Sequence, residues 1–207
     1  MINKTTMILI GYSGHAFVVY GILTAAGKKV TGYCDVAEKE CNPFKLPYFG
    51  VENSETGLQA LKQNSFFIAI GDNGLRSKIF FNLKQKQLSP ANAIHPTAVI
   101  DTSTTIAQQG VMIAAHVSIN PLASIGTGAI CNTGCIIEHE CVVGEFTHIG
   151  PGAVLCGNVK IGNGTFVGAN AVIKQGIVVG INAMIGAGAV VVKNVPDGVT
   201  VVGIPAK

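Results

Sequence analysis

The feature that most constrains the fold of this chain is a six-residue repeat from Ile113 to Val191. An apolar residue returns at every sixth position, and thirteen of the fourteen residues in this column are Ile, Val or Leu. The column consists of Ile113, Ile119, Ile125, Cys131, Ile137, Val143, Ile149, Leu155, Ile161, Val167, Ile173, Val179, Ile185 and Val191. A six-residue step turns an α-helix by about 600° and spreads the column around its surface, so helical spacing does not produce the pattern. The structural unit is therefore a hexad.

The other hexad positions predict a short strand followed by a sharp turn. Three residues after the column stand mostly Gly and Asn, such as Gly134 and Asn158, which tolerate positive φ. Three hexads close a triangular coil of eighteen residues, and stacked coils bury the apolar column as a continuous core. Residues 93–207 are therefore predicted to form a parallel β-helix, an all-β solenoid. The step from Ile106 to Ile113 indicates one inserted residue in the first coil.

Residues 1–92 are predicted to form a small Rossmann-like domain of the α/β class with a parallel βαβ sheet. The expected elements are strands at Met7–Ile10, Val30–Cys34 and Phe66–Ile70, and helices at Ala16–Ala26 and Leu75–Lys86. Between Glu38 and Gln59 the sequence indicates turns, because Pro43 and Pro47 disfavour a long element.

The three expected strands end in Gly or Asp, so polar loops meet at the carboxyl edge of the sheet, where such folds bind ligands. The turn from Gly11 to His15 precedes a helix whose free N–H groups attract phosphate. Asp35 lies 21 residues after Gly14, near the place of a ribose-binding carboxylate. The sequence therefore predicts a nucleotide site in this domain.

Composition excludes several functional classes. The net charge of +3 is small, and no Lys/Arg cluster indicates nucleic-acid binding. No apolar run approaches the roughly 18 residues that span a bilayer, and Met1–Thr6 lacks the features of a signal peptide, so a cytoplasmic protein without a membrane role is expected. Four of the six cysteines occupy positions filled elsewhere by small residues, which favours reduced cysteines used as apolar filler.

One segment of the solenoid departs from the turn pattern. From Ile125 to Val191, Gly or Asn is replaced in the turn column only at Glu140 and Phe146, within a stretch that holds two His and three Glu. The loss of the preferred turn residues at this place indicates a functional site, for which local stability is given up. The alternative is that these residues are merely solvated turn residues. His139 precedes Glu140 in the turn and is expected to point outward.

Several motifs together resemble a known family. They are Gly11–His15, Phe67–Asn73, His95-Pro96, Ile137–Cys141 and Gly203–Lys207. With these motifs the chain is similar to the sugar O- and N-acetyltransferases of the left-handed β-helix class. The likeness is greatest to bacterial N-acetyltransferases of nucleotide-linked 4-amino sugars, of the UDP-N-acetylbacillosamine-forming type. The resemblance covers essentially the whole chain, and it implies a left-handed solenoid, acetyl-CoA as co-substrate, no metal and a homotrimer.

The resemblance also implies roles for individual residues. The general base falls on His139 and its supporting carboxylate on Glu140. The acetyl-CoA contacts fall on His148, Gly157, Ala169 and Ala187, with the Gly157 N–H meeting the thioester oxygen. The nucleotide-sugar contacts fall on Ser13, Gly14, His15, Asp35 and Gly71. Val36 stands where relatives often have a second acidic residue, which puts the contact to the nucleotide base in doubt.

Hexad spacing agrees with these roles independently. Ala169 and Ala187 are one coil of eighteen residues apart and are expected to stack on one corner, as are His139 and Gly157. A base next to an oxyanion donor is what acyl transfer requires. The favoured function is therefore transfer of an acetyl group to a nucleotide-linked 4-amino sugar, with UDP-linked sugars first and GDP- or dTDP-linked sugars behind them.

Three alternative functions remain open. O-acetylation of a sialic-acid-type sugar uses the same site, and sequence does not separate amine from hydroxyl acceptors. A zinc-dependent hydratase needs three converging His, for which His116, His139 and His148 are the candidates. A non-catalytic scaffold leaves Glu140 and the nucleotide-like loop unexplained.

Overall fold

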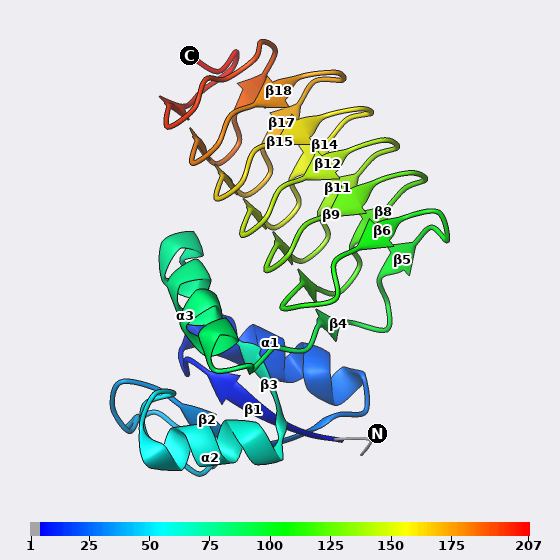
Figure 1. Ribbon diagram of the computed structural model, residues 1–207. Coiled ribbons are helices and arrows are strands. Elements are labelled where there is room, and N and C mark those ends of the chain that lie inside the picture. Colours follow the sequence, from blue (N-terminus) through cyan, green and yellow to red (C-terminus); the bar gives the residue numbers. More distant parts are fainter. Residues whose placement is uncertain (1–4) are drawn as a thin grey trace.

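The computed structural model describes residues 5–207 and contains a small N-terminal α/β domain followed by a long β-solenoid (Figure 1). Four of the six residues Met1–Thr6, from which the sequence predicts no signal peptide, lie outside the described residues. None of the helices within residues 5–207 is long and apolar enough to cross a bilayer. The cysteines are all free, and four of the six are buried.

The N-terminal domain is the predicted parallel sheet with helices around it. Its strands are β1 (Thr6–Ile10), β2 (Lys29–Cys34) and β3 (Ser65–Ile68), in the spatial order β2-β1-β3. Its helices are α1 (Gly14–Ala25), α2 (Glu55–Gln63) and α3 (Asn73–Gln85). Because the strands are parallel, the loops after β1, β2 and β3 meet at one edge of the sheet.

Helix α2 corrects the prediction of turns alone between Glu38 and Gln59. The helix begins at Glu55, and the hydroxyl of its N-cap residue Ser54 accepts a hydrogen bond from the Gly57 amide at 3.1 Å. This cap and the acidic first turn are ordinary helix-start signals. Only nine residues follow the cap, so the apolar periodicity was too short to reveal the helix.

The solenoid consists of three parallel sheets of two-residue strands. The first contains β4 (Ala93–Ile94), β7 (Met112–Ile113), β10 (Ile130–Cys131), β13 (His148–Ile149), β16 (Phe166–Val167), β19 (Met184–Ile185) and β21 (Thr200–Val201). The second contains β5 (Val99–Ile100), β8 (Ser118–Ile119), β11 (Ile136–Ile137), β14 (Val154–Leu155), β17 (Val172–Ile173) and β20 (Val190–Val191). The third contains β6 (Thr105–Ile106), β9 (Ser124–Ile125), β12 (Val142–Val143), β15 (Lys160–Ile161) and β18 (Val178–Val179). We call these the first, second and third sheets.

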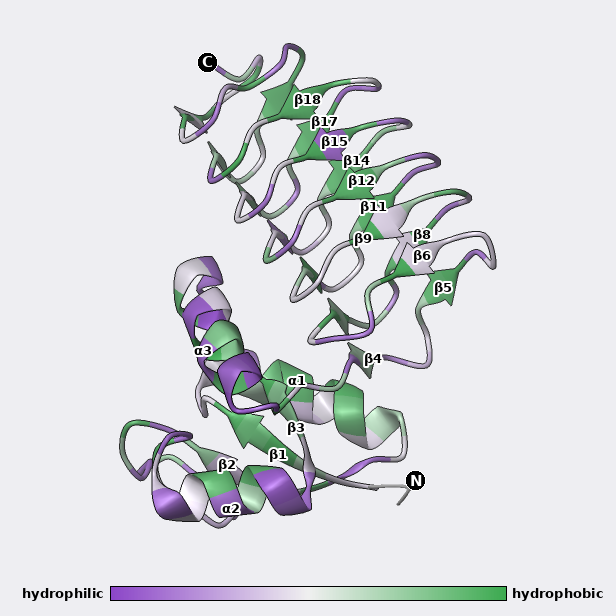
Figure 2. Ribbon diagram, viewed as in Figure 1, coloured by the Kyte–Doolittle hydropathy of each residue, from purple (hydrophilic) through white to green (hydrophobic). Residues whose placement is uncertain are grey.

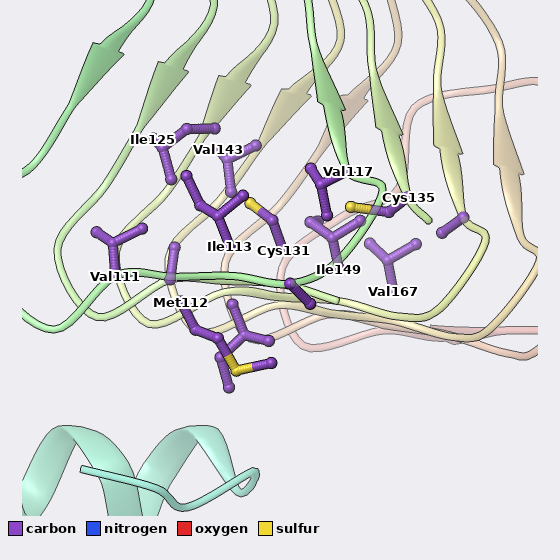
Figure 3. Packing of buried hydrophobic residues seen from close by; sticks show 14 of the residues in the cluster. Val111, Met112, Ile113, Val117, Ile125, Cys131, Cys135, Val143, Ile149 and Val167 are labelled. Atoms are coloured by element: carbon purple, nitrogen blue, oxygen red, sulfur yellow. The ribbon is translucent and has the colours of Figure 1, made fainter. Parts of the chain in front are cut away.

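The register confirms the eighteen-residue coil and the inserted residue. Ile130 pairs with His148, eighteen residues later, whereas Ala93 pairs with Met112, nineteen residues later. The hexad column fills the interior, as with Ile113, Cys131 and Val143 in Figure 3. Many of the solenoid strands are green in Figure 2, whereas β15, which begins with Lys160, is partly purple.

The N-terminal domain packs on the outer face of the first sheet. Met112 points away from the solenoid interior, opposite to Ile113 (Figure 3), yet it is fully buried, as is its outward neighbour Ile130. Both belong to one apolar cluster with the buried residues of α1, including Val19. The two cores are thus continuous, and the N-terminal domain covers the outer face of the first sheet at β7 and β10.

Candidate active site

His139 and Glu140 form the turn between β11 and β12, at the corner where the second and third sheets meet. The His139 Nδ1 atom lies 3.1 Å from Glu140 Oε2, and the two side chains are 51% and 56% exposed. An ionised carboxylate only accepts hydrogen bonds, so Nδ1 carries the proton and Nε2 keeps its lone pair. The outward corner predicted for His139 therefore presents a free base nitrogen to solvent.

Gly157 lies beneath the imidazole ring, one coil further along. A Cβ at position 157 would stand 2.5 Å from both Cε1 and Nε2 of His139, so any side chain there would displace the ring from this position. The two turns are stacked by a hydrogen bond of 2.8 Å from the Asn158 amide to the His139 carbonyl. Within residues 5–207 the Gly157 N–H donates no hydrogen bond, which leaves a donor next to the base.

Cys141 lies near this corner but is a poor nucleophile. Cys141 is buried, and its Sγ donates to the carbonyl of Cys156 at 3.2 Å. Burial raises the pKa of the Cys141 thiol to about 11, so it is a thiol and not a thiolate at neutral pH. The surroundings of Cys141 therefore favour direct attack on an acyl donor over a covalent cysteine intermediate.

Ala169 and Ala187 stack on one corner, as their spacing predicts. The Gly188 amide donates to the Ala169 carbonyl at 2.8 Å, and the Asn170 amide below donates to Pro151 at 2.9 Å. This corner joins the first and second sheets, so it is not the corner of His139. Within one chain the structure does not bring these alanines together with the base.

A cavity of about 590 Å³ opens at the carboxyl edge of the N-terminal sheet. Three predicted nucleotide-sugar residues, Ser13, Asp35 and Gly71, line it, together with Lys39 and Lys78. The two lysines were not singled out from the sequence, and their signal was weak, because isolated lysines are common on helices and loops. Lys39 is paired with Asp35 at 2.9 Å, so Lys78 is the cation that, with the start of α1, suits a phosphate group.

The Asp35 carboxylate is already engaged within the protein. Its Oδ2 accepts from the Tyr12 amide at 2.8 Å, while Oδ1 accepts from the Val36 amide at 2.7 Å and pairs with Lys39 Nζ at 2.9 Å. These bonds hold the turn after β1 against the end of β2. Gly14 begins α1, and neither it nor His15 is among the residues lining the cavity.

A second cavity, of about 430 Å³, lies between the two domains and shares Gly71 and Asp72 with the first. His148 and Phe166, from adjacent strands of the first sheet, line its solenoid side. Neither cavity is lined by His139. His139 lies at one corner of the third sheet, and Gly164, which lines the second cavity, lies at the other. Because each edge of the triangular coil is six residues long, roughly 20 Å of strand and turn separates these two corners.

His148 is held as a neutral imidazole in this second cavity. Its Nδ1 lies 3.3 Å from the Gly71 carbonyl, which only accepts, so Nδ1 carries the proton, and Nε2 lies 3.1 Å from Asn132 Nδ2. Burial lowers the pKa of His148 to about 4, and burial likewise lowers that of His15, whose ring centroid is 6.0 Å away. Because both ring nitrogens of His148 are engaged, His139 is the better-placed base.

The second break in the turn pattern has a different cause from the first. Phe146 has φ +53° and is 6% exposed, with its ring 5.3 Å from Phe80 and 5.6 Å from Phe81 of α3. This side chain packs against α3 of the N-terminal domain. Of the two residues that break the turn pattern, only Glu140 contacts His139 in the candidate site.

Among residues 5–207, no group of three or more His, Cys, Asp and Glu side chains could hold a metal ion. His116, His139 and His148, the candidates for a zinc hydratase, do not converge within the chain.

Comparison with known proteins agrees with this geometry. A family model for the PglD N-terminal domain matches residues 6–83, and one for the bacterial transferase hexapeptide (six repeats) matches residues 140–175. The structure of PerB from Caulobacter crescentus in complex with CoA and GDP-perosamine is 37% identical, with a TM-score of 0.88, and the match covers 100% of this chain and 97% of PerB. This chain belongs to the PglD-type hexapeptide-repeat N-acetyltransferase family.

Other relatives of this PglD-type chain point the same way. The acetyltransferase domain of PglB from Neisseria gonorrhoeae FA1090, in complex with acetyl coenzyme A, is 32% identical with a TM-score of 0.91, and the match covers 99% of both chains. The GDP-perosamine N-acetyltransferase of Escherichia coli O157:H7 is 33% identical over 136 residues, which are 66% of this chain. The match spans 54% of that curated relative, about half its length.

Proposed function

We propose that this protein transfers an acetyl group from acetyl-CoA to the amino group of a nucleotide-linked 4-amino sugar. The observation that carries the proposal is the His139–Glu140 pair, with the ring lying over Gly157 and Nε2 free. The relatives described with CoA or acetyl coenzyme A support the donor, and those described with GDP-perosamine support a nucleotide-linked amine as acceptor.

The reaction needs one proton transfer and no covalent enzyme intermediate. The neutral amine attacks the thioester carbonyl while Nε2 of His139 takes the proton that the new C–N bond releases. Glu140 stabilises the imidazolium, and the Gly157 N–H donates to the oxyanion. The C–S bond then breaks, the amide forms, and CoA leaves as a thiolate that the imidazolium can protonate.

The choice of nucleotide is the finer part of the proposal. Sequence alone favours UDP, but Glu52 lines the first cavity together with the apolar Val51 and Val36. A carboxylate accepts two parallel hydrogen bonds from the N1–H and N2–H₂ of guanine, whereas uracil and thymine offer one N–H between two carbonyls. Glu52 therefore favours GDP-linked over UDP-linked and dTDP-linked sugars.

The deciding experiment is a panel of GDP-, UDP- and dTDP-linked 4-amino sugars, with free sialic acid as the O-acetylation control. Acetylated product is followed by mass spectrometry, and the His139→Ala variant provides the background. We expect the GDP-linked amine to give the highest kcat/KM and Glu52→Gln to reduce its advantage over the UDP-linked amine. Turnover of sialic acid alone would favour the O-acetyltransferase alternative.

We further propose that the active protein is a homotrimer whose site is shared between copies. His139 stands on a different corner from the two cavities, and the third sheet leaves Val142 and Val178 more than 40% exposed on its outer face. A neighbouring copy packed on this face brings its own His139 towards the cavities. Light scattering tests the trimer, and an active monomer would contradict it.

Subunit mixing tests the sharing. His139→Ala and a cavity variant, Gly71→Asp, are each expected to be inactive, whereas trimers reassembled from both regain part of the activity. No recovery in mixed trimers would place the complete site within one chain.

A further inference from the structure

Arg76 is a fully buried cation that joins the two domains. It lies in α3 and is 1% exposed, although long charged side chains seldom leave the surface unless they are paired. The five N–H groups of a guanidinium are all donors, and here each has an acceptor. The acceptors are the carbonyls of Ile70 and Gly71 for Nη1, Gly128 for Nε, and Phe146 with the Asn73 side chain for Nη2.

Within residues 5–207, no carboxylate accepts a hydrogen bond from this guanidinium. Asp72 exerts a minor favourable charge effect, but burial dominates and lowers the pKa of Arg76 to about 10, so the side chain stays charged at neutral pH. A buried cation of this kind is an expensive means of docking two domains. The outer face of the first sheet already docks α1 with apolar residues such as Met112 and Ile130. Apolar contact alone therefore does not account for Arg76.

The contacts of Arg76 converge on the wall that the two cavities share. Gly71 and Asp72 line both cavities, and the Gly71 carbonyl accepts from Arg76 Nη1 at 3.1 Å and from His148 Nδ1 at 3.3 Å. The next residue, Asn73, donates to the Gly164 carbonyl of the solenoid at 2.9 Å. Arg76, Asn73 and His148 thus tie the loop at residues 70–73 to the solenoid.

We propose that Arg76 is a positioning residue, which fixes this shared wall relative to the solenoid and so sets where the nucleotide-linked sugar stands for acetyl transfer. The proposal rests on the proposed function. A guanidinium suits the role because its rigid fork bonds the loop and the solenoid turns at the same time, which a lysine ammonium cannot do. Displacement of a bound substrate by about 1 Å is enough to cost on the order of 100-fold in rate.

The experiment compares Arg76→Lys, the milder Asn73→Ala and the control Lys84→Met in the full chain. Lys84 is exposed on the same helix, so the control removes one positive charge without touching the wall. We expect Arg76→Lys to lower kcat about ten- to 100-fold, and Asn73→Ala about threefold or more, with less than a threefold change in the KM for acetyl-CoA. The Lys84→Met control is expected to have the kcat and the KM of the wild type.

Two measurements separate positioning from a merely structural role. Amide hydrogen exchange at residues 70–73 is expected to quicken in Arg76→Lys while the solenoid strands keep their protection. Rates are normalised to folded enzyme, so that loss of stability alone leaves kcat unchanged. Wild-type kcat in Arg76→Lys, or in Asn73→Ala if the lysine variant does not fold, would overturn the proposal. Failure of the wild type on every nucleotide-linked amine would instead overturn the proposed function.

Discussion

Replacing Glu140 by Asn should make the protein at least as stable and yet less active. Glu140 has φ +61°, whereas the stacked turns that follow use Asn158 and Gly176 at φ +55° and +72°. Non-glycine residues in this left-handed region cost roughly 1–2 kcal/mol, and Asn is among the side chains that adopt it most readily. The substitution therefore restores the turn residue that the repeat uses elsewhere.

The magnitude follows from two opposing terms. Asn adopts the positive φ with less strain than Glu, and this stabilises the folded state by about 1 kcal/mol. Loss of the pair with His139 costs ~0–1 kcal/mol, because both partners are about half exposed to solvent. The free energy of unfolding is thus expected to change by between about 0 and +1 kcal/mol, which raises Tm by up to about 4 °C in a chain of this size.

The rate should move the other way. Without the carboxylate, nothing orients the imidazole at Nδ1 or stabilises the imidazolium, and a loss of about 1.4 kcal/mol in the transition state lowers kcat about tenfold. Thermal unfolding and steady-state turnover of the same preparations provide the two readings. Full activity, or a loss of more than 1 kcal/mol in stability, would refute the reasoning. Phe146→Asn is the matched control, because it relaxes the same kind of turn but removes a buried ring and should destabilise the protein.

Three further predictions concern other parts of the molecule. His139→Ala should lower kcat about 10²- to 10⁴-fold and leave acetyl-CoA binding and Tm unchanged, as calorimetry and turnover can check. Phe146→Ala should lower the free energy of unfolding by roughly 3–5 kcal/mol, since its ring packs against Phe80, and urea denaturation measures the loss. Burial lowers the pKa of His15 and His148 to about 4, so the unfolded chain binds more protons between pH 6.5 and 4. The free energy of unfolding should therefore decrease as the pH is lowered through that window, by up to ~2 kcal/mol per histidine between pH 7 and 5. His148→Gln should make the free energy of unfolding less dependent on pH.

The sequence by itself determined the solenoid and placed His139 and Glu140 at an outward corner of it. Each hexad position has one fixed orientation, so the column from Ile113 to Val191 faces inward wherever the coil continues. The same arithmetic placed Gly157 one coil after His139 and located the inserted residue before Ile113. The strand ends of the N-terminal sheet were predictable too, since parallel strands bring their carboxyl ends to one edge.

Only the tertiary structure decided what the outward-facing residues do. Glu140 and Phe146 both break the turn pattern in the sequence, yet Glu140 contacts the His139 ring and Phe146 packs under α3. Arg76 gives no sequence signal, because its acceptors are backbone carbonyls from distant turns. The physical reason is that a periodic pattern records burial within one repeating unit, whereas domain docking depends on non-periodic contacts between residues that are far apart in the chain.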